Sequence, residues 1–300
     1  MHVLVTGGAG FIGQHLVAAL LARGDRVRVL DNFDDAYDPA LKSVPAGAEL
    51  VRGDVCDPGV VRAALRGVEG VCHLAGRAGV RESIVDPEPY GRNNVGATIT
   101  LLHAMRAASV ARMVFTSSSS VYGAAGGPSR ESDPADRPTS PYAASKRAAE
   151  LFCAASGLDV TVARLFTVYG PGQRPGMAIA RFVRLARTGE TIPVYGDGTS
   201  LRDYTWVGDT VDGLLRGLDR AEGYRVVNLG GGHPVAMTEL LAAVADATGR
   251  QLKVRWLPPQ PGDVPVTHAD PRVAWDWLEW RARTPFREGV ARYVDWLERR

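Results

Sequence analysis

The sequence predicts an α/β protein in which a Rossmann-type, doubly wound parallel sheet is joined to a smaller C-terminal lobe. Short apolar segments alternate with segments whose apolar residues recur at helical spacing, and a glycine-rich turn follows the first apolar segment. The expected strands cover residues 2–5, 27–30, 50–51, 71–74 and 113–116, and the expected helices cover residues 11–23, 60–65, 94–108 and 142–155. Repeated succession of strand and helix is typical of βαβ units, whose parallel strands are buried on both faces.

The sequence pattern changes after Phe166, where clusters of glycine and proline interrupt shorter helices and strands. We therefore expect the Rossmann-type domain over residues 1–168, with residues from about 203 to 232 returning to it. Residues 169–300 are expected to form mainly the smaller lobe. A chain of 300 residues is long enough for one large domain or two closely joined ones.

Charge and composition exclude several classes of protein. The formal net charge is only +2 and the arginines are dispersed, so a nucleic acid is not an expected partner. Cys56, Cys72 and Cys153 form no CxxC pair, and we expect neither a disulfide nor a metal site. The N-terminus does not resemble a leader, and no stretch is apolar over the roughly 20 residues that span a bilayer. These features predict a cytoplasmic protein without membrane contact.

The glycine-rich turn after the first strand predicts a dinucleotide site. Gly7, Gly10 and Gly13 are three residues apart and open a helix, so a pyrophosphate can approach backbone amides at the positive helix N-terminus. Asp31 ends the second strand 18 residues later, close to the spacing of about 20 for a carboxylate that binds ribose hydroxyls. An acid there repels a 2′-phosphate, so NAD is expected rather than NADP. Asp54, after the third strand, is expected beside the adenine.

A tyrosine and a lysine four residues apart predict acid–base chemistry. Tyr142 and Lys146 lie on one face of an expected helix. A free tyrosine has a pKa of about 10, and a neighbouring cation favours the phenolate and lowers that pKa. The serine run 117–120 follows a buried strand, and its hydroxyls can hydrogen-bond a reacting oxygen. Tyr142 is therefore expected to remove a proton from a substrate hydroxyl, assisted by Ser118.

Over essentially its whole length the chain resembles the extended short-chain dehydrogenase/reductase family. The resemblance rests on GGAGFIG at 7–13, HLAG at 73–76, TSSSSVYG at 116–123 and YAASK at 142–146; HLAG departs slightly from the more usual HLAA. It implies Tyr142 as the base, Lys146 as its electrostatic partner and ribose contact, and Ser118 as the third catalytic residue. The implied NAD site comprises Gly7, Gly10, Phe11, Ile12, Gly13, Asp31, Asn32, Asp54, Val55, Leu74, Ala75, Gly76, Asn93 and Lys146.

Two segments narrow the reaction within the family. Sugar-nucleotide 4,6-dehydratases carry an Asp-Glu pair after the catalytic hydroxyl residue, and uronate decarboxylases typically carry Glu at the second of these positions; this chain has Ser119 and Ser120. Residues 165–177, LFTVYGPGQRPGM, resemble UDP-glucuronate 4-epimerases, whereas UDP-glucose 4-epimerases usually have Asn in place of Thr167. The likeness implies that Thr167 and Arg174 bind the C6 carboxylate, which a guanidinium fork matches in shape.

Further substrate contacts are implied by the same resemblance. Arg202 matches the arginine that binds the diphosphate, the loop 260–263 matches one near the nucleotide, and Tyr195 matches a residue of the uracil pocket. The implied substrate site comprises Arg81, Ser83, Ser118, Ser119, Ser120, Tyr142, Thr167, Arg174, Tyr195, Arg202 and Asp263. Gly172 departs from the commoner GPRQ form of the family segment, so one cation is missing.

The implied activity is NAD-dependent C4 epimerisation of a UDP-sugar through a 4-keto intermediate, with UDP-glucuronate converted to UDP-galacturonate. The alternatives are a UDP-glucose or UDP-N-acetylglucosamine 4-epimerase, a UDP-glucuronate decarboxylase, and a non-catalytic dinucleotide sensor of the same fold. The sequence does not separate UDP from dTDP. Relatives commonly dimerise through helices that correspond to residues 94–108 and 142–155, so the resemblance implies a homodimer.

Overall fold

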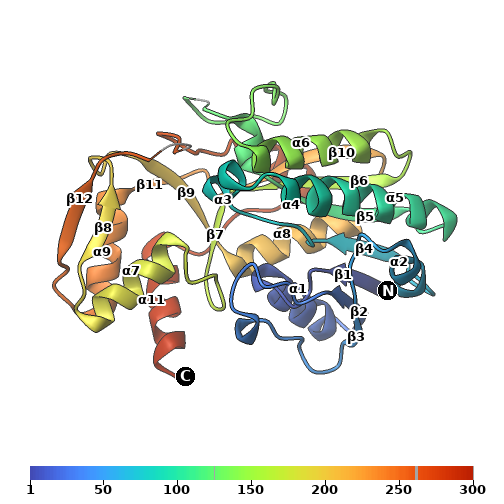
Figure 1. The fold of residues 1–300 in the computed structure, drawn as a ribbon, viewed down its shortest axis with the longest axis horizontal. Helices are drawn as coiled ribbons and strands as arrows, with labels where there is room; N and C mark the ends of the chain where they lie inside the picture. The colour runs from blue at the N-terminus through green and yellow to red at the C-terminus, as the bar shows by residue number, and fades with distance from the viewer. Residues whose placement is uncertain (125, 261–262, 300) are drawn as a thin grey trace.

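A seven-stranded parallel sheet forms the centre of the molecule. The computed structural model describes residues 1–124, 126–260 and 263–299. The strand order is β10-β6-β5-β4-β1-β2-β3, and Figure 1 shows this sheet between layers of helices. Its strands are β1 (His2–Thr6), β2 (Arg26–Asp31), β3 (Glu49–Arg52), β4 (Gly70–His73), β5 (Arg112–Ser118), β6 (Asp159–Leu165) and β10 (Tyr224–Leu229). The predicted α/β class with a Rossmann-type parallel sheet is confirmed.

Helices cover both faces of this sheet because its strands are apolar on both sides. In β1, Val3 and Val5 face one core, with α1 and α8, whereas Leu4 faces the other, with α2, α5 and α6. Such alternation buries the whole strand, as expected for a doubly wound sheet. The helices of these layers are α1 (Phe11–Ala22), α2 (Pro58–Ala64), α5 (Ala97–Ala107), α6 (Pro141–Ala154), α8 (Val207–Asp219) and the short α3 (Val80–Val85), α4 (Glu88–Tyr90) and α10 (Arg272–Leu278).

The expected elements of the first half are present, with shifted ends. The helix expected at 60–65 begins at Pro58, because the Asp57 side chain accepts hydrogen bonds from Gly59 and Val60 and so caps its N-terminus. The helix expected at 94–108 begins as α5 only at Ala97, after a π-helical turn over Gly91–Gly96. Strand β6 was not among the predicted strands, although its residues are almost all buried.

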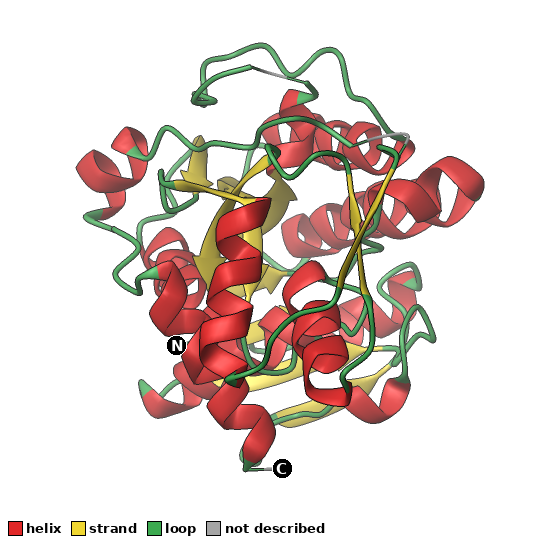
Figure 2. Cartoon of the chain, turned by 90° about the vertical axis from the view of Figure 1, so that its left-hand side faces the viewer, coloured by secondary structure: helices red, strands yellow, loops and turns green. Residues whose placement is uncertain are grey.

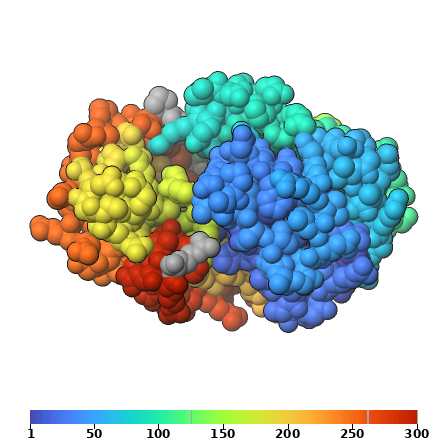
Figure 3. Space-filling model, turned by 60° about the horizontal axis from the view of Figure 1, so that its bottom comes forward, coloured from blue at the N-terminus to red at the C-terminus, as the bar shows by residue number. Residues whose placement is uncertain are grey.

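The second half forms a smaller lobe beside the carboxyl edge of the sheet. It contains the three-stranded sheet β11-β9-β7 and the two-stranded sheet β12-β8. Figure 2 is turned so that this lobe faces the viewer, and Figure 3 shows it, in yellow to red, beside the blue N-terminal half. Its elements are β7 (Thr167–Tyr169), α7 (Ala178–Thr188), β8 (Ile192–Tyr195), β9 (Leu201–Trp206), β11 (Pro234–Ala236), α9 (Met237–Thr248), β12 (Val254–Leu257) and α11 (Phe286–Glu298).

The chain crosses between the lobe and the central sheet more than once. After β9, helix α8 packs against the face of the central sheet that also carries α1, and β10 then pairs in parallel with β6. The lobe has its own core, which includes Phe182 of α7, Leu240 of α9 and Val290 of α11. Among the described residues, no helix combines the length and apolarity needed to cross a bilayer.

Candidate active site

A cavity of about 340 Å³ lies at the carboxyl edge of the central sheet, where it meets the lobe. In open α/β sheets this edge is where ligands bind. The cavity brings together the whole expected NAD site and all three expected catalytic residues. From these groups it is lined by Gly7, Gly10, Phe11, Ile12, Gly13, Asp31, Asn32, Asp54, Val55, Leu74, Ala75, Gly76, Asn93, Ser118, Tyr142 and Lys146.

The glycine turn presents the N-terminus of α1 to this cavity. Gly7 has φ of 69°, and a Cβ there would lie 2.7 Å from the Ala75 nitrogen; a Cβ at Gly13 would lie 2.2 Å from the Gly7 oxygen. Only glycine therefore allows this close packing of turn, helix and neighbouring loop. Within the described residues, no side chain caps α1, although its first residues line the cavity. An uncapped helix N-terminus beside a glycine turn fits a diphosphate.

Asp31 and Asp54 line the end of the cavity nearest β2 and β3. The Asp31 carboxylate accepts hydrogen bonds from the backbone N–H groups of Ala9 (3.0 Å) and Phe33 (2.8 Å), which fix its orientation. Asp54 accepts hydrogen bonds from the Cys56 N–H (2.8 Å) and from Arg92 (2.7 Å). Each carboxylate retains acceptor capacity, and Asp31 in particular fits a pair of ribose hydroxyls.

Tyr142 and Lys146 are placed by the first turns of α6. Ser140 caps this helix by accepting a hydrogen bond from the Ala143 N–H (3.1 Å), and Pro141 occupies its first position, so the helix begins directly at the cavity. The Lys146 ammonium donates a hydrogen bond to the Thr116 carbonyl (2.8 Å). Burial lowers the pKa of Lys146 to about 8, although Cys153 and Glu150 act in the opposite direction.

Burial and two neighbouring side chains act on the Tyr142 phenol in opposite directions. Burial raises the pKa of Tyr142, whereas a hydrogen bond with Ser118 and the positive charge of Arg174 both act to lower it. The positive charge of Arg174 therefore favours the Tyr142 phenolate. The sequence analysis named Lys146 as the cationic partner of Tyr142; its ammonium donates a hydrogen bond to the Thr116 carbonyl, and this role stays a prediction.

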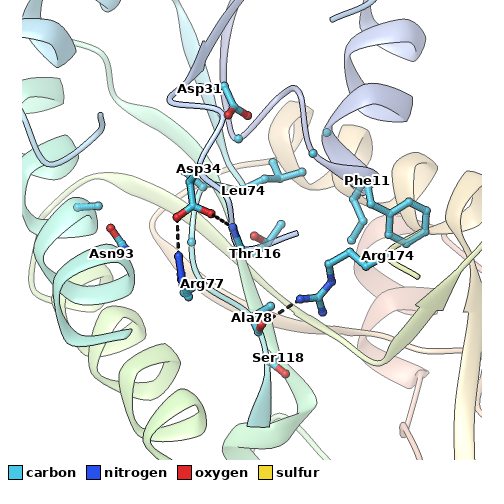
Figure 4. Close-up of a pocket in the computed structure, with 18 of the residues that line it drawn as sticks. Phe11, Asp31, Asp34, Leu74, Arg77, Ala78, Asn93, Thr116, Ser118 and Arg174 are labelled. Atoms are coloured by element: carbon cyan, nitrogen blue, oxygen red, sulfur yellow. Dashed lines mark hydrogen bonds and ion pairs between the residues drawn. The ribbon is translucent and has the colours of Figure 1, made fainter. Parts of the chain in front are cut away.

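Thr167 and Arg174 line the same cavity as the catalytic residues. Thr167 begins β7, directly after the central strand β6, and Arg174 comes from the loop that follows. The Arg174 guanidinium donates a hydrogen bond to the Ala78 carbonyl (2.9 Å), which directs it across the cavity, as Figure 4 shows. This contact leaves most of its five N–H donors available to a ligand.

The other serines of the expected substrate site form hydrogen bonds within the protein in this structure. Ser83 is fully buried, and its hydroxyl accepts a hydrogen bond from the Tyr142 N–H (3.1 Å) at the start of α6. Ser120 accepts a hydrogen bond from the Ser118 hydroxyl (3.2 Å). Ser119 and Ser120 form a 3₁₀ turn after β5, and neither they nor Ser83 are among the described residues that line the cavity.

Four of the expected substrate residues form a separate group outside the cavity, which we call the outer group: Arg81, Tyr195, Arg202 and Asp263. Arg81 forms an ion pair with Asp263 (2.8 Å) and lies over the ring of Tyr195, 5.4 Å from its centre. Burial lowers the pKa of Arg202, on which the charges of Asp263 and Arg81 also act. Pro261 and Gly262, in the expected nucleotide loop, lie outside the described residues.

The sequence of residues 3–230 matches the model of the NAD-dependent epimerase/dehydratase family. This match covers more than half of the chain. The chain belongs to this family. The NAD in the family description agrees with a cavity that fits a dinucleotide.

Several proteins are similar to this chain over nearly its full length. UDP-glucuronate 4-epimerase of Thermodesulfobacterium geofontis is 36% identical, covering 98% of this chain and 95% of the relative. MoeE5, solved with UDP-glucose and NAD and also with UDP-glucuronic acid and NAD, is 40% identical with a TM-score of 0.92, covering 100% of this chain and 99% of that chain. UDP-glucuronic acid 4-epimerase of Bacillus cereus, solved with UDP-glucuronic acid and NAD, is 30% identical with a TM-score of 0.94 and the same coverage.

Several residues of this epimerase/dehydratase site were missed by the sequence analysis. Asn94 is buried and holds the loop after β4 to α6: it accepts a hydrogen bond from the Arg77 N–H (2.7 Å) and donates one to the Ser145 hydroxyl (2.8 Å). The adjacent pair Asn93-Asn94 was a signal, but only the fold tells which side chain faces the cavity. Other charged or aromatic lining residues not expected from the sequence are Asp34, Tyr37, Lys42, Arg77 and Phe166.

Proposed function

We propose that this protein is an NAD-dependent 4-epimerase that interconverts UDP-glucuronate and UDP-galacturonate. The observation that carries the proposal is the position of Arg174, which lines the same cavity as Tyr142 and Ser118 and directs its charge toward the Tyr142 phenol. A guanidinium beside the reacting centre suits a sugar that carries a carboxylate. The named relatives with this activity, similar over nearly the full chain, support the same substrate class.

The cavity has residues that fit the diphosphate of NAD and residues that fit its adenosine. The glycine turn and the N-terminus of α1 would hold the diphosphate, and Asp31 and Asp54 would contact the adenosine. Lys146 and Asn93 would contact the nicotinamide riboside half. When bound, NAD would accept a hydride from C4 of the sugar and later return it to C4.

Tyr142 is the proposed acid and base at the sugar O4. As a base it removes the O4 proton when C4 is oxidised, and as an acid it returns a proton when C4 is reduced. Ser118 hydrogen-bonds Tyr142 and would also hold O4 within reach of the phenol. The charge of Arg174 and the positive charge of a bound nicotinamide would both lower the proton affinity of the phenol.

Thr167 and Arg174 would keep the carboxylate on the sugar. A uronate oxidised at C4 is a β-keto acid, and it loses carbon dioxide when the breaking bond aligns with the carbonyl π system. Contacts that hold the carboxylate out of this alignment would suppress the loss. The same two residues would thereby serve both substrate selection and product fidelity.

The outer group is proposed to hold the nucleotide while the sugar turns. Arg202 would bind the diphosphate and Tyr195 the uracil, with Arg81 and Asp263 beside them. A firm hold on the nucleotide and a loose hold on the hexose let either face of C4 meet the cofactor. We accordingly propose a division of labour in which residues 1–168, with about 203–232, bind NAD and residues 169–300 mainly bind the nucleotide sugar.

We further propose that the enzyme is a cytoplasmic homodimer. Ile99 on α5 and Leu151 and Phe152 on α6 are large apolar side chains that are 40%, 54% and 45% exposed. They lie on the two helices that the family resemblance assigns to a dimer interface, and a two-fold pair would cover them. Cys56, Cys72 and Cys153 are free thiols in the described structure, which suits a reducing compartment.

The test is incubation of the purified protein with UDP-glucuronate and NAD, followed by NMR of the sugar resonances and of carbon dioxide. Appearance of UDP-galacturonate with little carbon dioxide would establish the activity. A UDP-pentose would make the protein a decarboxylase. Since MoeE5 has been solved with UDP-glucose as well as UDP-glucuronic acid, UDP-glucose is assayed in parallel, and faster turnover of this neutral sugar would overturn the uronate assignment.

A further inference from the structure

An ion pair joins two loops that flank the proposed NAD cavity. Asp34 lies in the loop after β2, Arg77 lies in the loop after β4, and the Arg77 guanidinium donates a hydrogen bond to the Asp34 carboxylate (2.6 Å). Both residues line the cavity, and Figure 4 shows the ion pair as a dashed line between their side chains. Neither residue has a role in the function proposed above.

The strand order shows what this ion pair spans. Strands β2 and β4 lie on either side of β1, whose carboxyl end leads into the glycine turn. A bond between the loops after β2 and β4 therefore passes over the carboxyl end of β1. A dinucleotide that reaches from Asp31 at the end of β2 to Tyr142 on α6 has to pass along this stretch of the sheet edge.

Both ends of the pair are fixed by the surrounding structure. The Arg77 backbone is held by Asn94, which accepts a hydrogen bond from its N–H (2.7 Å) and donates one to its carbonyl (3.0 Å). The Asp34 carboxylate accepts a hydrogen bond from the Ala36 N–H (2.8 Å), which orients it. An ion pair between preordered groups loses less side-chain entropy on forming than one between two free surface chains.

Two cations, Arg77 and Lys42, lie beside the Asp34 carboxylate. Lys42 donates a hydrogen bond to the Asp34 carbonyl, and its ammonium lies 3.9 Å from the Asp34 carboxylate. Burial alone would raise the pKa of Asp34, but Arg77 and Lys42 hold it below the ordinary value. Asp34 thus remains ionised between Arg77 and Lys42, and the neighbouring Asp35 carboxylate also acts on Arg77.

We propose that Asp34 and Arg77 form a clasp over the dinucleotide that slows its release from the enzyme. The clasp rests on the proposed function only in that the cavity holds NAD. An epimerase that oxidises and re-reduces the same sugar needs its reduced cofactor to stay bound between the two steps. Closing the cavity with an ion pair between opposite loops meets this need without touching the reacting atoms.

The test measures NADH release without any sugar. Purified protein is loaded with NADH, mixed with excess NAD in a stopped-flow instrument, and followed by NADH fluorescence. The variants are Asp34→Asn, Arg77→Gln and the double variant. Each is expected to release NADH about two- to fivefold faster, which corresponds to a partly exposed ion pair of up to about 1 kcal/mol. The double variant should be no faster than the single ones, since all three break the same contact.

Two matched variants separate the clasp from general effects of charge. Asp35→Asn removes an exposed carboxylate from the same loop and should leave release unchanged, and Arg77→Lys keeps the charge and should retain slow release. Slower release in Asp34→Asn would overturn the clasp, because Asp34 would then be competing with the phosphates for Arg77 and Lys42. Additive effects, or rates equal to that of Asp35→Asn, would also overturn it. Absence of sugar turnover would contradict the proposed function, but it would not affect the NADH release measurement, which uses no sugar.

Discussion

Glu150 and Arg164 form a bidentate ion pair in the interior of the protein, with Nε and Nη2 of Arg164 donating to the two carboxylate oxygens over 2.9 and 2.8 Å. Their side chains are 0% and 2% exposed. Ser117 at the end of β5 donates a further hydrogen bond to Glu150 (2.5 Å). The pair therefore joins β5, α6 and β6, the three elements that carry Ser118, Tyr142 and the approach to Thr167.

Breaking this pair should destabilise the fold strongly. Burial alone would raise the pKa of Glu150, but hydrogen bonds and charge from Arg164 hold it below the ordinary value, so both partners are charged. Glu150→Gln leaves the Arg164 charge buried without its partner and should lower the free energy of unfolding by about 3–5 kcal/mol, measured by urea denaturation.

The double variant Glu150→Leu with Arg164→Met tests whether the charge imbalance causes this loss. Replacement of both charges by apolar side chains of similar size should recover most of the stability. Asp212→Asn is the surface control, because it breaks the half-exposed pair with Arg216 and should have little effect. A loss in Glu150→Gln no larger than in this control would contradict the prediction.

Tyr142→Phe should lower kcat about 10²- to 10⁴-fold, the usual contribution of a positioned general acid or base. The phenyl ring keeps the edge contact with Tyr90, whose centre lies 6.1 Å away, so the affinity for NADH should remain within about twofold. Tyr90→Phe is the matched control and should keep most of the activity. Equal losses in both variants would show that ring packing, and not the phenolic proton, is the source of the effect.

The part of the site that the sequence predicted consists of short-range patterns. The glycine turn and the Tyr142–Lys146 pair each lie within a few residues, and helix geometry alone determines how they are presented. The strand ends of a parallel sheet all meet at one edge, so Asp31 and Ser118 could be placed at the same cavity from the strand pattern.

The features that were missed depend on contacts between distant segments. Asp34 and Arg77 are 43 residues apart, and nothing in their local sequence indicates a pair. Arg174 reaches Ala78 over 96 residues, so its effect on Tyr142 could be found only after folding. Strand β6 was missed although Val160 and Val162 alternate with polar residues. Its Arg164 is buried because Glu150 pairs with it.

Arg174→Ala should change both the pH profile and the products. The positive charge of Arg174 acts to lower the pKa of Tyr142. Its removal raises that pKa, so the phenolate forms at higher pH and the rising limb of kcat against pH should move to more alkaline values. The share of UDP-pentose in the products should rise as well, since the carboxylate loses its partner. Both are measured by NMR of the products across a pH series.

Arg174→Lys separates charge from shape at this position. Lysine keeps the positive charge and should restore the pH profile, but it cannot present the planar fork that matches a carboxylate. It should therefore retain an elevated share of UDP-pentose. If both variants merely weaken the binding of all sugars and leave the product ratio unchanged, Arg174 does not serve fidelity.

His73 should make the protein sensitive to acid. Its ring is fully buried between the hydroxyls of Thr6 (2.7 Å) and Thr98 (3.1 Å), and burial, with a contribution from the charge of Lys146, lowers its pKa to about 3. The unfolded chain binds the proton near pH 6.5. Between about pH 3 and 6.5 the unfolded state thus holds more protons than the folded state, so stability rises with pH and falls on acidification.

The expected slope from this one group is at most about 1.4 kcal/mol per pH unit. His73→Gln removes the titrating ring, and its free energy of unfolding should fall less than that of the unaltered protein when urea denaturation is compared at pH 7.5 and pH 4.5. His103→Gln, at an exposed position of α5, should behave like the unaltered protein. Parallel losses in the two variants would mean that the acid sensitivity comes from other groups, such as the paired carboxylates of Glu150 and Asp34, whose folded pKa values are also lowered.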